Sequence, residues 1–353
     1  MTVTSYTTAT VTASDGTQVY PNLMDTNGNY FSTDGSGNIK DTLGRSPVTK
    51  TTNGSQTTYG VLNSQNARSN FVVTTQNISV STSFSGGTEY SGTITVIQSV
   101  QLPDGTTYQF SYDSGTTPGH YGLLTGITLP TLGQVTFGHT NFTDPIGKIN
   151  RWVSSYGTGS GTRSFTPQVL TPCPSGFTTC QQVTVTKPSS DNVVYTFGLN
   201  NGAWMSQAQY YSGAVSPANL LKTINQTWNT SNPCPIPGCT GSAYIQKVST
   251  TTTLPVPGGS SISSMVQSTY GSIYSSNVTA FQEWKFYTGS PPAIPDRQTD
   301  ITYGAFNRPL TITACAPTGT PPSCTGSSNI AAKTVFYLQP RNINQRNGIH
   351  KPR

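Results

Sequence analysis

Charged residues are scarce in this chain of 353 residues: Asp, Glu, Lys and Arg make up 8% of it, against about 25% in an average globular domain. Strong helix formers are also few, and no long stretch places apolar residues at helical spacing. No run of about 18 apolar residues occurs, so no membrane-spanning segment is expected. These absences argue against a helical protein and against a membrane span.

What fills the chain instead is typical of β-structure. Thr, Ser, Gly, Asn and Tyr are abundant, and 18 Tyr with 13 Phe supply aromatic area for a core. Gly and Pro together make about 17% of the chain, below the roughly 25–30% that indicates low-complexity disorder. The length allows two domains or one large continuous β-structure. The composition therefore predicts a folded, turn-rich, all-β protein.

The net charge of +6 is concentrated at one end. Residues 338–353 hold Arg341, Arg346, Lys351 and Arg353 and no acidic residue, which leaves 14 basic against 12 acidic residues in the rest. A nucleic-acid-binding protein needs a basic face on its folded part. We therefore expect no nucleic-acid partner, and we interpret residues 338–353 as a basic disordered tail.

The remaining residues, 1–337, are expected to form one ribbon of β-hairpins, and a division of this ribbon near residues 155–180 is left open. The first residues lack the basic and apolar regions of a signal peptide. Because other features are typical of an exported protein, the export signal is expected upstream of this chain.

The clearest hairpin signal runs from Asp104 to His139. Aromatic and polar residues alternate in Tyr108–Asp113, as a half-buried strand requires. A turn at Leu129–Gly133 then leads into a second alternating run, Val135–Phe137. Weaker copies of this plan follow within 182–211 and 283–312, so the chain is expected to consist of consecutive antiparallel β-hairpins.

Six cysteines fall in three close pairs, and each pair brackets a turn-rich loop between strand-like segments. The pairs are Cys173 with Cys180, Cys234 with Cys239, and Cys315 with Cys324. Three local disulfides fit this spacing and imply an oxidising, exported location. Free thiols remain an alternative, and zinc is a weaker one because no His lies nearby.

Three turns that start with Asp and contain Gly follow one another within residues 25–45. Calcium binding is one reading, because Asp and Asn oxygens cluster there. The loops lack the ligand spacing of a calcium loop and its closing Glu. Turns in which Asp bonds to its own backbone explain the same residues, and we expect no metal.

Together, these residues resemble the tyrosine-aspartate (YD) repeats of RHS-type proteins. One match is an alternating strand that ends in Tyr-x-Tyr-Asp and is followed by a Gly-containing body; another is a Tyr-Gly…Arg-Pro-Leu segment. The matching residues are Tyr108, Phe110, Tyr112, Asp113, Gly122, Leu124, Gly133, Tyr303, Arg308 and Leu310. The family's Arg is missing before Leu123, and Gly304 stands where the family has Asp.

The resemblance implies a spiral ribbon of β-hairpins that forms part of a hollow shell, here an incomplete one. It implies a non-catalytic, encapsulating role in a secreted or cell-surface protein, as in toxin-delivery proteins or surface scaffolds. The expected partners are then the remainder of a larger YD-repeat protein or an enclosed effector polypeptide.

Candidate catalytic residues are few, because the chain has 12 acidic residues and three His. His120 and His139 lie close in sequence to Asp113 and Asp144, and Ser111 is nearby, so that a Ser-His-Asp arrangement is possible in principle. No nucleophile motif accompanies these residues. We therefore expect no catalytic residue, no cofactor and no enzyme. The alternative is a surface adhesive or carbohydrate-binding β-protein whose exposed aromatic residues stack on cell-surface glycans.

Overall fold

The computed structural model describes residues 2–3, 9–12, 18–20, 23–25, 27–34, 36–84, 87–199, 202–229, 245–271, 277–304, 307–319, 322–324 and 329–336. Residue contacts divide the chain into two units. The N-terminal unit comprises Met1–Phe142 and Ile149–Arg163, and the C-terminal unit comprises Thr143–Lys148 and Ser164–Arg353. The proposed basic tail, 338–353, lies outside the described residues.

The described residues contain β-strands, one 3₁₀ turn (Pro217–Asn219) and no α-helix. The prediction of an all-β fold of consecutive antiparallel hairpins is confirmed. Within the described part of the chain, no helix has the length and apolarity to cross a membrane.

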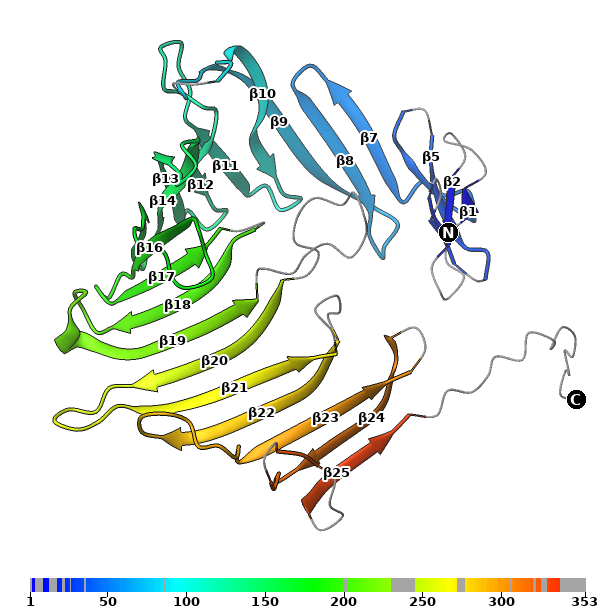
Figure 1. Cartoon of the computed structure of the whole chain (residues 1–353). Coiled ribbons are helices and arrows are strands. Elements are labelled where there is room, and N and C mark those ends of the chain that lie inside the picture. Colours follow the sequence, from blue (N-terminus) through cyan, green and yellow to red (C-terminus); the bar gives the residue numbers. More distant parts are fainter. Residues whose placement is uncertain are drawn as a thin grey trace, which may run out of the picture. The chain divides into compact units, whose positions relative to one another are not determined.

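In the N-terminal unit, each strand from β1 to β12 pairs antiparallel with the next one (Figure 1). The strands are β1 (Thr2–Val3), β2 (Ala9–Thr12), β3 (Gln18–Tyr20), β4 (Leu23–Met24), β5 (Tyr30–Thr33), β6 (Ile39–Asp41), β7 (Val48–Asn53), β8 (Gln56–Leu62), β9 (Arg68–Ser81), β10 (Ser91–Gln101), β11 (Thr107–Tyr112), β12 (Leu124–Thr128), β13 (Gln134–Thr143) and β14 (Ile149–Thr158).

The C-terminal unit continues the same plan, since each strand from β15 to β25 pairs antiparallel with its successor (Figure 1). The strands are β15 (Gly161–Val169), β16 (Cys180–Thr186), β17 (Asn192–Gly198), β18 (Trp204–Tyr211), β19 (Leu220–Asn229), β20 (Gln246–Leu254), β21 (Ile262–Tyr270), β22 (Val278–Tyr287), β23 (Arg297–Tyr303), β24 (Pro309–Cys315) and β25 (Ile330–Val335).

One five-residue turn recurs between these strands. The first residue of the turn receives a hydrogen bond from the fourth, donates one to the fifth, and the fourth has positive φ. Such turns start at Asp25, Asp34, Asp41, Asn63, Leu102, Leu129, Asp144 and Lys187. Gly is common at the fourth position because a residue without Cβ reaches positive φ at little cost.

Acidic residues at the start of these turns bond to their own backbone. Asp34 Oδ1 accepts hydrogen bonds from the Ser36 N–H at 3.0 Å and the Asn38 N–H at 2.9 Å. Asp25 and Asp41 make the same pair of bonds. The carboxylates at 25–45 therefore serve as turn caps, as the turn interpretation expects, and among the described residues no group of His, Cys, Asp and Glu is arranged to hold a metal.

The two faces of the C-terminal unit's sheet differ in chemistry, because residues directly opposite in antiparallel strands share a face. The face that we call the polar face carries two rows of mostly uncharged polar side chains. One row is Gln168, Gln182, Thr196, Gln207, Asn225, Thr251, Met265 and Trp284. The other row is Thr227, Ser249, Gln267, Gln282, Gln298 and Cys315.

On the opposite face, which we call the apolar face, β15 to β19 carry many aliphatic and aromatic residues at the intervening positions, whereas β20 and β21 continue it with Thr252 and Ser264. One of its rows runs through Pro167, Val183, Tyr195, Ala208 and Ile224. Val183 and Ala208 are buried. Over β15 to β19, the alternation of polar and apolar residues therefore places many apolar side chains on one side of the sheet.

Gly198, on the polar face, makes room for an aromatic ring. A Cβ at this position would collide with the ring of Phe177, which belongs to the loop before β16. Phe177 therefore lies directly on the sheet at the one position of β17 without a side chain. This contact holds the loop that follows β15 against the polar face.

Replacing Gly198 with Ala should displace the Phe177 ring and lower the free energy of unfolding by roughly 1–3 kcal/mol, the usual cost of overpacking. Urea denaturation monitored by circular dichroism measures this. Gly159→Ala is the matched control, since a Cβ there meets no atom within 4 Å. Equal stability of the Gly198 variant and the wild type would contradict the packing.

The turn carboxylates also predict how stability depends on pH. The side-chain hydrogen bond from Asn38 and the backbone bonds lower the pKa of Asp34 below its ordinary value of 3.8, and Asn29 and Arg45 do the same for the pKa of Asp25 and Asp41. A lowered folded-state pKa means that the stabilisation is present above the unfolded-state value and is lost as pH falls through the folded-state one.

We therefore expect the melting temperature to fall as pH drops below about 4. Asp34→Asn, which keeps the Oδ1 acceptor but cannot titrate, should remove part of this dependence. NMR titration of the Asp34 carboxyl carbon checks the cause directly, and a midpoint at or above 3.8 would show that the turn does not favour the ionised form.

Candidate functional site

Two of the three predicted disulfides lie in the described part of the chain. Cys173 and Cys180 are bonded, with a sequence separation of 7, and Cys315 and Cys324 are bonded, with a separation of 9. The third predicted pair, Cys234 and Cys239, lies outside the described residues. Cys180 and Cys315 are almost fully buried, so that each bridge anchors its loop at a strand end.

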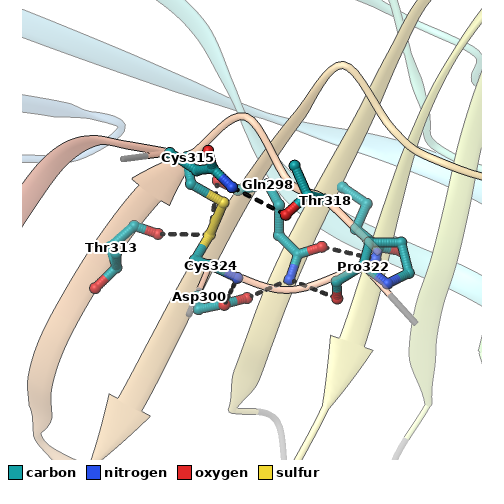
Figure 2. The surroundings of a disulfide bond; sticks show 9 residues. Gln298, Asp300, Thr313, Cys315, Thr318, Pro322 and Cys324 are labelled. Carbon is teal, nitrogen blue, oxygen red and sulfur yellow. Dashed lines mark hydrogen bonds between the residues drawn. A yellow bond between two sulfur atoms is a disulfide. The ribbon is translucent and has the colours of Figure 1, made fainter. Parts of the chain in front are cut away.

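The Cys315–Cys324 loop lies over the polar face and is held there by Gln298 of β23 (Figure 2). The side chain of Gln298 donates to Asp300 Oδ1 at 2.7 Å and to the Pro322 carbonyl at 3.4 Å. Its carbonyl oxygen accepts from Gln282 Nε2 at 2.9 Å. Gln298 is only 4% exposed, and these bonds compensate for the burial of its amide.

Asp300 extends this network to the disulfide itself. One of its carboxylate oxygens accepts from Gln298, and the other accepts from the Cys324 N–H at 3.3 Å (Figure 2). The polar row of the sheet, the loop and the bridge are thus joined by side-chain hydrogen bonds. The arrangement stabilises the loop, and the Asp300 carboxylate is engaged through both of its oxygens.

The polar face is covered in the same way at two further places. Trp284 donates its indole N–H to the Pro292 carbonyl at 2.8 Å, so that the loop between β22 and β23 covers it. Phe177 of the Cys173–Cys180 loop rests on Gly198. Three loops therefore fold onto one face of this sheet and bury the residues beneath them.

A groove with a volume of ≈ 420 Å³ remains beside the Cys173–Cys180 loop. One wall is the Cys173–Cys180 loop, and the floor is the polar face of β16 to β19. Its lining residues are Leu170, Pro172, Cys173, Pro174, Ser175, Gln182, Thr196, Ser206, Gln207, Asn225, Gln226 and Thr227. We call this space the amide groove.

The floor of the amide groove is ordered by hydrogen bonds between neighbouring strands. Gln207 Nε2 donates to Asn225 Oδ1 at 2.9 Å, and Gln182 Nε2 donates to Thr196 Oγ1 at 3.3 Å. Among the hydrogen bonds of the described residues, the other polar atoms of these amide groups take no part. The groove therefore offers both donors and acceptors to a bound molecule, on a floor without a charged side chain.

A second polar cluster lies in the N-terminal unit around Asp113. Its Oδ1 bonds to His120 Nδ1 at 2.8 Å, and its Oδ2 accepts from the Tyr121 N–H at 3.0 Å. The guanidinium of Arg151 lies 3.9 Å from Asp113 Oδ2 and stacks over the ring of Tyr121 at 4.4 Å. Asp113 is thus the centre of a network that ties the segment after β11 to β14.

The charges in this cluster shift two pKa values. Partial burial would raise the pKa of Asp113, but the Tyr121 N–H, the His120 side chain and the Arg151 charge together hold it below its usual range. Burial and then the charge of Arg151 lower the pKa of His139, against the opposing effect of Asp113. The carboxylate at Asp113 is therefore stabilised in its ionised form.

Of the residues considered for a Ser-His-Asp arrangement, the structure joins His120 to Asp113. Asp144 Oδ1 instead accepts from the N–H groups of its own turn. His120 packs against Gly115 and bonds to Asp113. Ser111 lies opposite Gly126 of β12, and no hydrogen bond between the Ser111 hydroxyl and His120 occurs among the described residues. The absence of catalysis stays a prediction.

The residues that carry the YD-repeat resemblance occupy strand and turn positions. Tyr108, Phe110 and Tyr112 lie in β11, Asp113 follows it, and Leu124 begins β12. The others lie at Gly122, in the turn at Gly133, at the end of β23 (Tyr303), in the following turn (Arg308) and in β24 (Leu310). Gly122 has positive φ and packs against Ile94 and Val80, so these residues shape hairpins.

Sequence reasoning missed the amide groove. Its floor residues come from four strands and stand far apart in the sequence, and its wall is set by the disulfide. The available signal was the recurrence of Gln, Asn and Thr at alternate positions within β16 to β20. That signal predicts a polar face but not which part of it a loop leaves open.

Replacing both Cys315 and Cys324 with Ser should lower the free energy of unfolding by about 2.5 kcal/mol, from the loop-closure entropy of a loop of this size. Chemical denaturation of this variant, beside a Cys173→Ser/Cys180→Ser variant, measures each bridge. Intact mass before and after alkylation confirms the oxidation state. An unchanged midpoint would show that the hydrogen bonds around Gln298 hold the loop without the bridge.

No protein-family model and no curated protein sequence matches the chain. Among solved structures, the chain is similar to one in the crystal structure of TcdB2-TccC3-Cdc42, with a TM-score of 0.35 and 11% sequence identity. The match covers 85% of this chain and 16% of that chain, so this chain spans about a sixth of its length.

Proposed function

We propose that this chain is a non-catalytic wall segment of an exported β-sheet scaffold, and that the scaffold encloses or holds another polypeptide. The YD-repeat resemblance of the sequence suggests this role. The structural observation that supports it is the unbroken hairpin ladder of the C-terminal unit, in which every strand from β15 to β25 pairs with its successor.

A ladder of this kind suits a wall better than a compact enzyme. Each hairpin buries its side chains against the next hairpin, as in repeat proteins, whose stability comes mainly from contacts between neighbours. Twelve apolar residues are buried in the described part of the chain. Five of them, not counting Cys180, lie in the neighbouring strands β16, β17 and β18. The sheet thus covers a large area with a thin core.

The disulfides support export. Two bonded pairs lie within single loops, and disulfides persist chiefly in oxidising compartments.

The polar clusters support a non-catalytic role. Asp113 and His120 are joined to Tyr121 and Arg151 in a network that fixes local structure. Asp300 is bonded to Gln298 and Cys324. Asp113 and Asp300 thus act as positioning groups within the sheet. The lowered pKa of Asp113 has a structural cause in the Tyr121 N–H, the His120 side chain and the Arg151 charge.

The test uses the protein isolated from its natural source and treated with proteinase K under native conditions. A wall that holds another polypeptide should protect peptides from outside residues 1–353, which mass spectrometry identifies. Val194→Asp, which places a carboxylate at a buried position of β17 (4% exposed), should open the sheet and abolish the protection.

Val266→Asp is the matched control, because Val266 is 43% exposed and tolerates a charge. Protection should survive in this variant. Recovery of the chain as a monomer with no other protected polypeptide would overturn the wall proposal. An enzymatic activity that disappears in Asp113→Asn while the protein stays folded would overturn the non-catalytic part.

A further inference from the structure

We propose that the amide groove binds a neutral carbohydrate, one or two sugar rings at a time. This inference goes beyond the wall proposal and does not depend on it, because it rests on the chemistry of the groove alone. The groove is bounded by the Cys173–Cys180 loop and by the polar face of β16 to β19.

The lining excludes charged ligands by its composition. Its twelve residues include no Asp, Glu, Lys, Arg or His. An anionic or cationic ligand placed here would lose hydration without gaining an opposite charge, which is costly. A neutral ligand avoids this penalty, so that uncharged hydroxyl-bearing molecules fit the site better than phosphates, nucleotides or charged peptides.

The floor supplies the two kinds of hydrogen bond that a sugar hydroxyl needs. A hydroxyl donates one bond and accepts others, and a carboxamide side chain offers both an acceptor oxygen and donor N–H groups. Gln182 of β16, Gln207 of β18 and Asn225 of β19 belong to one row of the polar face. Because neighbouring strands lie about 4.8 Å apart, the row presents such groups at regular intervals across the width of a sugar ring.

These groups are already oriented. The bond from Gln207 to Asn225 and the bond from Gln182 to Thr196 fix the amide planes from one side, and leave the Gln207 oxygen and the Asn225 nitrogen without a partner among the described residues. Thr227 is fixed likewise by its bond to Ser249 at 2.7 Å. A ligand that meets an ordered surface loses less entropy on binding.

The wall supplies apolar surface opposite this floor. Leu170, Pro172 and Pro174 line the groove from the loop side, and their C–H groups can contact the apolar faces of a sugar ring. The bridge from Cys173 to the buried Cys180 fixes this wall to the sheet. The groove volume of ≈ 420 Å³ falls within the range of about 300–1,000 Å³ typical of small-molecule sites.

A pocket in the N-terminal unit is the competing place for a sugar. It is lined by Tyr30, Phe31 and Leu43 together with the Asp41–Arg45 ion pair, among other residues. Its aromatic rings could stack on a sugar, but the Asp41 carboxylate is engaged with its own turn and with Arg45. The experiment therefore also includes a variant of this pocket, Phe31→Ala, to show which of the two places binds a sugar.

The experiment titrates the full chain with lactose, maltose, cellobiose and chitobiose, and measures binding by isothermal calorimetry and by NMR shifts. At least one of these disaccharides should bind. The double variant Gln207→Leu/Asn225→Leu, which removes both amides at similar volume, should weaken that binding at least tenfold. Thr227→Asp, which adds a negative charge to the groove, should weaken it as well.

Gln267→Leu is the matched control, because Gln267 lies on the same polar face outside the groove and should leave binding unchanged. Circular dichroism and disulfide mapping verify that each variant is folded. The single variant Thr227→Asp, at an exposed position, keeps the test valid if the double variant does not fold.

Three outcomes would overturn the inference. The first is that none of the four disaccharides binds. The second is that binding persists in the groove variants and disappears in Phe31→Ala. The third is that an uncharged Ser-Asn-Gly peptide binds at the groove residues while the sugars do not. None of these outcomes touches the protease-protection test, so that failure of the carbohydrate site and failure of the wall proposal are distinguishable.

Discussion

The antiparallel hydrogen-bonded ladder is the constraint on which the rest of this structure depends. In such a ladder, side chains alternate between two faces and opposite residues share a face. A shift of one residue in any strand would move its polar side chains to the apolar face and its apolar side chains to the polar one. In the C-terminal unit, the row from Gln168 to Trp284 stays on one face, and the β-bulges of three strand pairs lie beside it. The five-residue turns contribute to this constancy, because the turn geometry fixes which residues of two successive strands are paired.

The polar face of the sheet is covered by loops at some places and open at others. Where a loop covers it, every buried amide needs a partner, since an unsatisfied polar group is costly in the interior. Gln298 meets this demand with bonds to Gln282, Asp300 and the Pro322 carbonyl. In the N-terminal unit, Asp113 has a comparable role for the segment after β11, with partners His120 and Tyr121. Groups that resemble catalytic residues in the sequence are therefore used to join loops to strands.

The sequence alone predicts the fold class well, because its signals are local. Alternation in Tyr108–Tyr112 and the turn residues from Asp25 to Arg45 act over a few residues, and the structure forms strands and turns there. Close cysteine spacing likewise predicts the two described bridges. Pairing with β18 and β20 makes Leu220–Asn229 a strand, which its local sequence alone does not decide. The amide groove could not be predicted, since Gln182 and Asn225 meet on one face only through the pairing of the strands between them.

The open part of the polar face differs from the covered parts in one physical respect. Beneath the Cys315–Cys324 loop, the amide of Gln298 is buried and bonded on several sides. Beside the Cys173–Cys180 loop, the amides of Gln207 and Asn225 bond to each other and keep further capacity. The polar side chains of this face therefore stabilise the fold where a loop covers the sheet. Where no loop covers the sheet, they keep hydrogen-bonding capacity for a ligand. The boundary between these two situations lies at the wall fixed by the buried Cys180, so that this bridge affects both the stability of the sheet and the shape of the groove.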